Sequence, residues 1–421
     1  MKKEVKMNPN SKWYGPKQIG MMLYTAMLLL IGTCIIGGNN NTVFPMFSEI
    51  RGWDVSILNI VSGIGCILKA VGVLVLARTI RKIGAKNLTV ITLFISAALL
   101  FVFGSTQSLP VFLVVILILG FLGGGYEKNG GMTLTANWWP TKKGVVLGFT
   151  TMAIVAMNFV YVPVMPKLLG AIGLGGGMSV IAVILIVVAV IGLVCVKNTP
   201  EEAGEYPDGD TSYAASGADI SKQMQEYKSP FTLKKVLADK NTWFIGLGSA
   251  FAFMAVMSYI ASAITSMMAY GYEYTFATRL FAVGGVMGII GSFLFGLLDQ
   301  KIGTKKAFVG YFIMILIGFV VALFMPKGAI FCWICTVIIF IAQGALCNLL
   351  PSYVATKYGR WDYTSGYQVI GFMFEAGAGV GVMMTGFFAS ANTMYIFDII
   401  CLAIGLVFMA LSSDKFVGKA G

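Results

Sequence analysis

The sequence predicts an all-α integral membrane protein with twelve transmembrane helices, arranged as two pseudo-symmetric six-helix bundles. Three observations support this fold class. Of the 421 residues, 57% are hydrophobic and only 11% are charged, whereas about a quarter of a soluble domain is charged. Apolar runs of transmembrane length recur along the whole chain. A short sequence pattern also repeats at a fixed distance in the two halves.

Twelve apolar segments alternate with polar turns. We place them at residues 17–44, 55–77, 88–106, 110–137, 145–166, 174–196, 243–270, 277–298, 307–325, 328–355, 364–388 and 392–412. Each is close to the roughly 20 residues that one helical crossing needs. The first is too long for the apolar core of a cleavable signal, so we expect it to remain as a membrane helix.

The basic residues indicate on which side the termini lie. Twelve crossings put both termini on one side, and most Lys and Arg residues fall in segments on that side. The exceptions are Arg51, Lys167, Arg279 and Lys327 at the opposite side, and Lys69 and Lys128 within spans. By the positive-inside rule both termini are therefore cytoplasmic. The net charge of +12 reflects this topology in a plasma membrane, and we expect no nucleic-acid partner.

One long polar stretch interrupts the apolar pattern. It contains Pro200-Glu201-Glu202, Pro207-Asp208-Gly209 and a basic pair, Lys234-Lys235. Its composition is typical of a linker. We therefore divide the chain into an N-terminal bundle (1–196), a cytoplasmic linker (197–241) and a C-terminal bundle (242–421). Within the linker, Thr232–Ala238 has the pattern of a short amphipathic helix.

The two halves share a basic turn at the same place. Lys82-Ile83-Gly84-Ala85-Lys86 follows the second span, and Lys301-Ile302-Gly303-Thr304-Lys305 follows the eighth, 219 positions later. The same shift carries Gly72 onto Gly291 and Asn129 onto Asn348. Parallel repeats of six helices are the signature of a two-bundle transporter, in which substrate binds near the midplane between the bundles.

The second copy of this turn belongs to a longer motif, Gly291 to Lys306, that resembles the loop motif of the major facilitator superfamily. The resemblance covers essentially the whole chain and implies that fold. It also implies a conformational latch at the cytoplasmic helix ends, made by Asp299, Lys301 and Lys305. In the first copy Arg81 stands where Asp299 stands in the second, so the N-terminal copy of the latch is incomplete.

Further segments are similar to the oxalate–formate antiporter and monocarboxylate transporter branch of that superfamily. They are Gly52-Trp53, Asn137-Trp138-Trp139-Pro140 and the linker run Pro200 to Gly209. The branch binds a dicarboxylate with a lysine and an arginine, and here Glu375 and Gly291 occupy the aligned positions. The resemblance therefore implies a carboxylate carrier, but the missing cations argue against oxalate.

Five ionisable residues lie within the predicted spans: Lys69, Glu127, Lys128, Glu375 and Asp398. A charge at mid-bilayer costs about 2.5–3.5 kcal/mol on insertion scales, so each asks for a partner or a function. Adjacent helical positions point in different directions, so we expect Glu127 and Lys128 to be poor partners for each other. Asp398 lies near the outer end of the last span, and we assign it a structural role.

The other ionisable residues have two interpretations each. Either Glu127 neutralises Lys69 or another helix partner, or one of Glu127 and Lys128 faces the cavity as a substrate anchor or proton carrier. Lys69 either extends towards the cytoplasmic surface or acts as a cavity cation. Glu375 lies near the midplane of span eleven, where it either carries a proton or pairs with Lys128 or Lys69 across the bundles. The sequence has no histidine, so proton coupling requires a carboxylate, Glu127 or Glu375.

Amides and tyrosines in the spans extend the candidate site. Asn39, Asn40 and Asn41 end the first span, and at least one should face the cavity, because a lipid-exposed amide would lack a hydrogen-bond partner. The full set of candidate substrate-binding residues is Asn39, Asn40, Lys69, Tyr126, Lys128, Asn129, Asn158, Tyr161, Gln343, Asn348 and Glu375.

These features favour a secondary active transporter of a small organic solute, a carboxylate-bearing metabolite. We expect it to work by alternating access as a monomer, with protons as a candidate coupling ion. The alternative is a proton-coupled exporter of an amphipathic or cationic compound. Cys332 and Cys335 have metal-like spacing, but there is no second pair and no histidine, so we expect no metal site. No nucleophile motif or cofactor motif points to an enzyme.

Overall fold

The computed structural model describes residues 7–418 except residues 38, 40–41, 140–141 and 213–228. The described chain is helical, with no strand, as the composition predicts. The N-terminal half contains α1 (Pro16–Ile36), α2 (Val43–Arg51), α3 (Val55–Ile83), α4 (Ala85–Ser105), α5 (Leu109–Gly123), η1 (Gly124–Gly130), α6 (Gly131–Trp138) and α7 (Lys143–Val194).

The second half begins after a polar linker. The linker carries η2 (Glu201–Ala203), η3 (Pro207–Gly209) and α9 (Leu233–Ala238). The C-terminal half contains α10 (Lys240–Ala269), α11 (Tyr274–Ile302), α12 (Thr304–Ala322), η4 (Met325–Lys327), α13 (Ala329–Phe387) and α14 (Ala391–Leu411). The predicted short linker helix is confirmed as α9, and the Thr232 hydroxyl caps it by accepting from the Lys235 backbone N–H.

Eleven helices of the described chain are long and apolar enough to cross a membrane. One of them, α7, is interrupted at Gly173, whose φ of 74° is readily adopted only by glycine. Counting its two parts separately gives the twelve predicted crossings. Gly359 interrupts α13 in the same way, with φ 65°. The fold class predicted from the sequence is therefore confirmed.

The first span is shorter than predicted. α1 ends at Ile36 and α2 begins at Val43, so Asn39 lies in a break between helices instead of inside one. Its carbonyl oxygen accepts from the backbone N–H groups of Val43 and Phe44 and starts α2. Glycine and asparagine favour such breaks, because glycine costs backbone entropy in a helix and asparagine bonds to the nearby backbone.

The internal repeat is visible in individual hydrogen bonds. The Asn129 amide donates to the Val73 carbonyl at 2.9 Å, and the Asn348 amide donates to the Ser292 carbonyl at 3.2 Å. Donor and acceptor are each displaced by the same 219 positions. The shared turn is equally matched, since Gly84 and Gly303 have φ of 84° and 86°. The repeat predicted from the sequence is therefore a repeat of structure.

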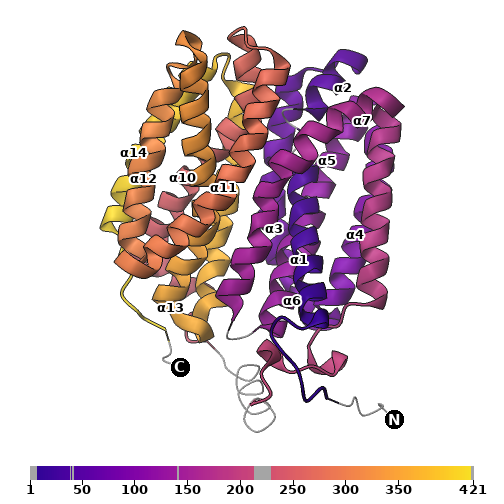
Figure 1. Cartoon of the computed structure of the whole chain (residues 1–421), viewed down its shortest axis with the longest axis vertical. Coiled ribbons are helices and arrows are strands. Elements are labelled where there is room, and N and C mark those ends of the chain that lie inside the picture. The colour runs from indigo at the N-terminus through magenta and orange to yellow at the C-terminus, as the bar shows by residue number, and fades with distance from the viewer. Residues whose placement is uncertain (1–6, 38, 40–41, 140–141, 213–228, 419–421) are drawn as a thin grey trace.

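The two bundles lie side by side, with the linker at one end of the molecule (Figure 1). We call this the linker end and the opposite end the far end. Towards the far end, α3 packs against α13, and a Cβ added to Gly379 would lie 2.7 Å from the Gly63 carbonyl oxygen. α7 packs against α11 there too, where a Cβ added to Gly285 would lie 2.9 Å from the Phe159 ring. Glycine thus permits close bundle contact at the far end.

The linker is tied to the start of the chain through Glu205. Its carboxylate accepts from the Ser11 hydroxyl at 2.6 Å, the Asn8 amide at 3.1 Å and the Gln18 amide at 3.2 Å. The Lys17 ammonium lies 3.5 Å away. Four partners on the N-terminal segment therefore hold one linker carboxylate at the surface of the N-terminal bundle.

Stability should depend on pH through Glu205. Burial alone raises the pKa of this carboxyl, but the hydrogen bonds from Ser11, Asn8 and Gln18 and the charge of Lys17 outweigh it and lower the pKa. Such a group stabilises the fold above its unfolded pKa, and the stabilisation is lost as pH falls through the folded value. We expect Glu205→Gln to lower the Tm at neutral pH, with the difference shrinking below about pH 4.3, the ordinary Glu pKa. Thermal unfolding in detergent measures this, and a pH-independent difference would contradict it.

The far-end contact gives a second prediction. A valine at Gly379 places its branched side chain against the α3 backbone, which should cost about 1–3 kcal/mol through overpacking. We expect Gly379→Val to lower the Tm and to increase labelling of Cys34, which is buried near the far end of α1, because the bundles separate there. Gly20→Val on α1 is the control, since a Cβ at Gly20 meets nothing within 4 Å. Equal effects of the two substitutions would show that the contact does not close the far end.

Candidate functional site

A cavity of about 750 Å³ lies between the two bundles. Its wall is formed by α1, α3, η1, α6 and α7 of the N-terminal half and by α10, α11 and α13 of the C-terminal half. On the part of α13 up to the interruption at Gly359, the wall extends from Gln343 to Gly359, about 24 Å at 1.5 Å per residue. Asp299 and Gly359 lie at helix ends next to the linker, so the cavity runs from mid-membrane towards the linker end.

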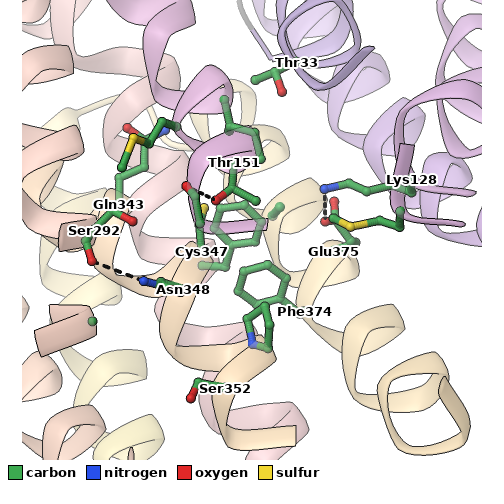
Figure 2. Close-up of a pocket in the computed structure, with 18 of the residues that line it drawn as sticks. Thr33, Lys128, Thr151, Ser292, Gln343, Cys347, Asn348, Ser352, Phe374 and Glu375 are labelled. Atoms are coloured by element: carbon green, nitrogen blue, oxygen red, sulfur yellow. Dashed lines mark hydrogen bonds and ion pairs between the residues drawn. The ribbon is translucent and has the colours of Figure 1, made fainter. Parts of the chain in front are cut away.

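Four ionisable side chains meet at the inner part of this cavity. Lys69 lies 3.3 Å from Glu127 and 3.6 Å from Glu375, measured from Nζ to the nearer carboxylate oxygen. Lys128 lies 3.3 Å from Glu127 and 2.8 Å from Glu375. We call these four residues the ion cluster; the Lys128–Glu375 pair is drawn in Figure 2. Cations and anions alternate around it, and its formal charge is zero.

An unusual helix places the N-terminal members of the cluster. Residues Gly124–Gly130 form a π-helix, η1, within the fourth span. The wider turn brings the side chains of Glu127 and Lys128 within 3.3 Å of each other, so the expectation that these neighbours are poor partners was wrong. That expectation assumed α-helical geometry, and π-helical turns are rare and concentrate at functional sites.

Close helix contact places Lys69 beside Glu127. A Cβ added to Gly124 would lie 2.5 Å from the Lys69 carbonyl oxygen, so only glycine allows η1 to approach α3 this closely. Glu127 is 1% exposed and packs against Gly32 of α1. It therefore lies at the back of the cluster, inside the N-terminal bundle.

Glu375 comes from the other bundle. It lies on the part of α13 that follows Gly359, and both of its cationic partners belong to the N-terminal half. All four members of the ion cluster are mostly buried, yet all four line the cavity. The pairing predicted as one interpretation of Glu127 and Glu375 is therefore present, and the same side chains also face the cavity.

The rest of the cavity wall is mainly apolar. Phe253 and Phe374 stack with ring centroids 4.1 Å apart next to Glu375. Methionines from several helices add flexible apolar surface: Met132, Met152, Met157 and Met257. The sequence alone does not single out these residues, because nothing in a single sequence distinguishes a cavity wall from a lipid-facing wall.

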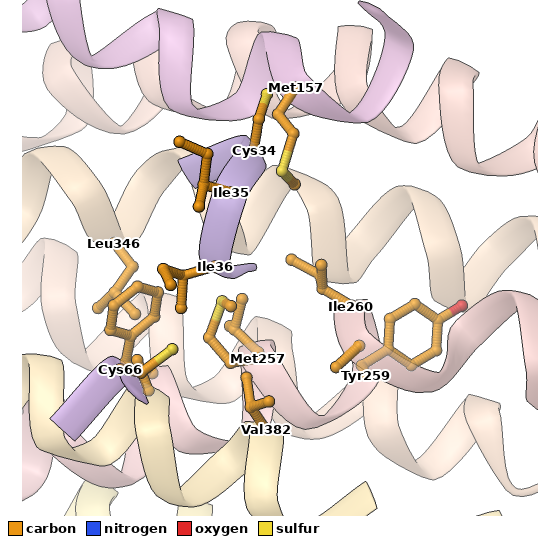
Figure 3. Close-up of a cluster of buried hydrophobic side chains, with 14 of the residues drawn as sticks. Cys34, Ile35, Ile36, Cys66, Met157, Met257, Tyr259, Ile260, Leu346 and Val382 are labelled. Atoms are coloured by element: carbon orange, nitrogen blue, oxygen red, sulfur yellow. The ribbon is translucent and has the colours of Figure 1, made fainter. Parts of the chain in front are cut away.

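An apolar cluster closes the cavity at its far end (Figure 3). It joins Ile36 of α1, Met157 of α7, Met257 and Ile260 of α10 and Val382 of α13, all buried or nearly so. Residues from both bundles thus seal this end against water, while the wall continues to the linker end.

The predicted substrate-binding residues divide into two groups. Lys69, Lys128, Gln343, Asn348 and Glu375 line the cavity. Asn39, Tyr126, Asn129, Asn158 and Tyr161 are not part of its wall, and Asn40 lies outside the described residues.

The asparagines of the second group and Tyr161 make hydrogen bonds within the protein. The Tyr161 hydroxyl donates to the Asn39 side-chain oxygen at 2.6 Å, joining α7 to the break after α1. The Asn158 amide donates to the Gln343 side-chain oxygen at 3.1 Å and so joins the two bundles. Tyr126 is fully buried.

The predicted latch residues make contacts inside the C-terminal half. The Asp299 carboxylate accepts from the Thr304 and Ser352 hydroxyls, each at 2.5 Å. The Lys305 ammonium donates to the Ser412 carbonyl at 2.7 Å, and Lys301 is exposed at the linker end. In this conformation Asp299 therefore holds α11, α12 and α13 together and also lines the cavity.

Two bundles of six crossings around a central, partly polar cavity define a multi-pass membrane transporter. The family model described as the Major Facilitator Superfamily matches residues 26–382, and the chain belongs to this family of transporters. No curated protein sequence matches the chain significantly.

Solved structures show the same fold. The crystal structure of a bacterial homologue of the human lysosomal transporter Spinster, inward-facing and occupied, matches with TM-score 0.70 at 14% identity, over 95% of this chain and 98% of that one. The inward-facing, unoccupied structure matches with TM-score 0.66 at 15% identity, over 94% and 97%. These identities are low, so the likeness is one of fold.

The ion cluster should respond to paired substitutions. Lys69→Met leaves Glu127 buried with one cation fewer, which should cost about 3–5 kcal/mol of stability. We expect Lys69→Met/Glu127→Leu to recover most of this loss, because the double variant removes both charges and keeps the Lys128–Glu375 pair. Unfolding of the single and double variants measures the coupling. Additive losses would mean that Lys69 and Glu127 do not stabilise each other.

Proposed function

We propose that the protein is a proton-coupled carrier of a carboxylate-bearing solute, working by alternating access between its two bundles. The observation that carries the proposal is the ion cluster at the inner part of the cavity, with two cations from one bundle and Glu375 from the other. Buried ionisable groups in membrane proteins mark substrate pathways and proton relays. A metabolite carboxylate has the same chemistry as the Glu375 side chain that Lys128 holds.

The charge balance of the cluster favours a single carboxylate and a single proton. When Glu375 takes up a proton, Lys69 and Lys128 face only Glu127, and the cluster carries one positive charge. One substrate carboxylate then restores neutrality by taking the place of Glu375 beside Lys128. An unbalanced buried charge is unfavourable. Binding of the proton therefore raises the affinity for the anion, and binding of the anion raises the affinity for the proton.

The remaining residues have supporting roles in this proposal. Glu127 keeps Lys69 charged and in place from the back of the cluster, and it is the second candidate for proton binding. Gln343 and Asn348 line the same cavity and supply amide groups for the polar part of a substrate. No bound cofactor or metal is needed for these steps.

Alternating access has a structural basis in the two ends of the cavity. The far end is closed by glycine contacts and by the apolar cluster of Figure 3, and the cavity extends towards the linker end. If basic residues mark the cytoplasm, as the positive-inside rule states, this is an inward-facing conformation in a plasma membrane. Glu375 couples to the opposite bundle only while the halves are close, so its protonation favours their separation.

The alternative function is proton-driven export of an amphipathic or cationic compound. The observation that favours it is the apolar wall of Met and Phe side chains, together with two carboxylates that could face a cation. Uptake into proteoliposomes under imposed pH gradients separates the two. A carboxylate carrier accumulates its substrate when the outside is acidic, whereas proton-driven export moves substrate against the proton flux.

The test of coupling is Glu375→Gln, which mimics the protonated state. We expect this variant to lose accumulation driven by a pH gradient and to keep counterflow exchange, because the site retains its positive charge but has lost the proton carrier. Accumulation and exchange of radiolabelled carboxylates in proteoliposomes measure both.

Asp398→Asn is the matched control. Asp398 is also buried in the C-terminal half, but it bonds to Ser258 at 2.6 Å and is not part of the cavity wall. This variant should keep gradient-driven accumulation. If Glu375→Gln loses exchange and unfolds at a much lower temperature, the role of Glu375 is structural pairing and the coupling proposal is wrong.

A further inference from the structure

We propose that the cavity opens sideways to the bilayer between α7 and α11, and that this opening admits the apolar chain of a long-chain monocarboxylate. The carboxylate of that molecule binds at the ion cluster, and its chain extends through the opening into the lipid. The inference rests on the proposed function and names the substrate class for the same site.

The first observation concerns where α7 and α11 are in contact. They touch in their far halves, where a Cβ added to Gly285 would meet Phe159, and where Gly288 packs on Val155. About two to three turns closer to the linker, a Cβ added to Gly148 of α7 would meet nothing within 4 Å. Gly148 and Gly296 of α11 both line the cavity, so the wall between these helices is thin at this level.

The second observation concerns which side chains face lipid. On α7, Phe149, Val160 and Val164 are 53%, 46% and 53% exposed, and their spacing of 11 and 4 positions places them on one helix face. In a membrane protein such an exposed apolar strip contacts lipid chains. Phe149 nevertheless belongs to the wall of the cavity.

On α11, too, side chains of an exposed apolar strip belong to the cavity wall. Val286, Ile290, Phe293 and Leu297 follow one another at spacings of 4, 3 and 4 positions, and Phe293 is 61% exposed. Phe293 and Leu297 also line the cavity. A side chain that belongs both to a lipid-facing strip and to the cavity wall marks a place where the cavity meets the bilayer.

The depth of the opening agrees with this reading. Phe149 lies about 9 Å from the start of α7 at Lys143, and Phe293 lies about 14 Å from the end of α11 at Ile302, at 1.5 Å per residue. Glu375 lies about 15 Å into its span from Ser365. By these depths the proposed opening extends from about one helical turn on the linker side of Glu375, at Phe149, to the depth of Glu375, at Phe293.

The chemistry of the wall indicates what passes through. The ion cluster offers a cation to one carboxylate, and Met152, Phe253 and Phe374 offer apolar surface beside it. A short hydrophilic acid would leave this surface against water, whereas an alkyl chain would cover it. Each added methylene that is buried should tighten binding about fourfold, until the chain reaches the lipid.

The experiment uses the full-length protein in proteoliposomes and two photoreactive probes, a diazirine-bearing hexadecanoic acid and the corresponding hexadecanol. Labelled residues are located by mass spectrometry in the wild type, in Gly148→Trp and in Gly170→Trp. A tryptophan at Gly148 projects into the opening. Gly170 is the control, because it lies on the same helix, is exposed, also meets nothing within 4 Å and is not in the cavity wall.

We expect both probes to label Met152 and Phe374 in the wild type and in Gly170→Trp, and this labelling to be lost in Gly148→Trp. Lys128→Gln should remove the preference for the acid over the alcohol. Failure of both probes to label the cavity wall, or equal labelling in all three proteins, would overturn the opening. Labelling by the alcohol with no preference for the acid would leave the opening standing and overturn carboxylate binding, which is the proposed function.

Discussion

Four charges at the middle of a membrane constrain the rest of this structure. Lys69, Glu127, Lys128 and Glu375 are too deep to be solvated by bulk water, so each must keep two opposite charges within about 4 Å. Several otherwise unfavourable features bring these opposite charges together. The π-helix η1 aims two adjacent side chains at one point, and Gly124 lets two helix backbones come close enough for Lys69 to join them.

The distribution of the cluster over the two bundles gives it a second consequence. Three members belong to the N-terminal half and balance to one positive charge, and the C-terminal half contributes the compensating carboxylate. The bundles are thus held together by electrostatics at the centre and by apolar and glycine contacts at the far end. A change of charge at Glu375 alters the electrostatic contact at the centre and leaves the apolar and glycine contacts at the far end unchanged. A ligand that binds at the centre can therefore shift the equilibrium between conformations.

Local features of the structure could be predicted from the sequence, and features that depend on distant residues could not. The twelve crossings follow from apolar length, and the matched turns at Gly84 and Gly303 follow from a short repeated motif. The cross-bundle bond from Asn158 to Gln343 joins residues 185 positions apart, and nothing local signals it. The Glu127–Lys128 pair was mispredicted for a related reason, because the sequence does not signal the π-helix η1, whose glycines pack against distant residues of α3 and α4.

The sequence resemblance to the oxalate–formate branch predicts an arginine at one position where this chain has a glycine, and the glycine has a packing role. The aligned position is Gly291 on α11, and a Cβ there would overlap the backbone of Ile341 on α13. Gly72, its counterpart in the first repeat, is pressed against the Phe121 carbonyl oxygen in the same way. Both halves therefore use this position for close helix contact, and an arginine could not be accommodated without moving α11 from α13. The C-terminal half supplies a carboxylate and no cation to the cluster, so in the proposed function the positive charge that holds a substrate anion comes from Lys69 and Lys128. A site built in this way balances one carboxylate, and a dicarboxylate would leave its second charge against the apolar wall of Phe253 and Phe374.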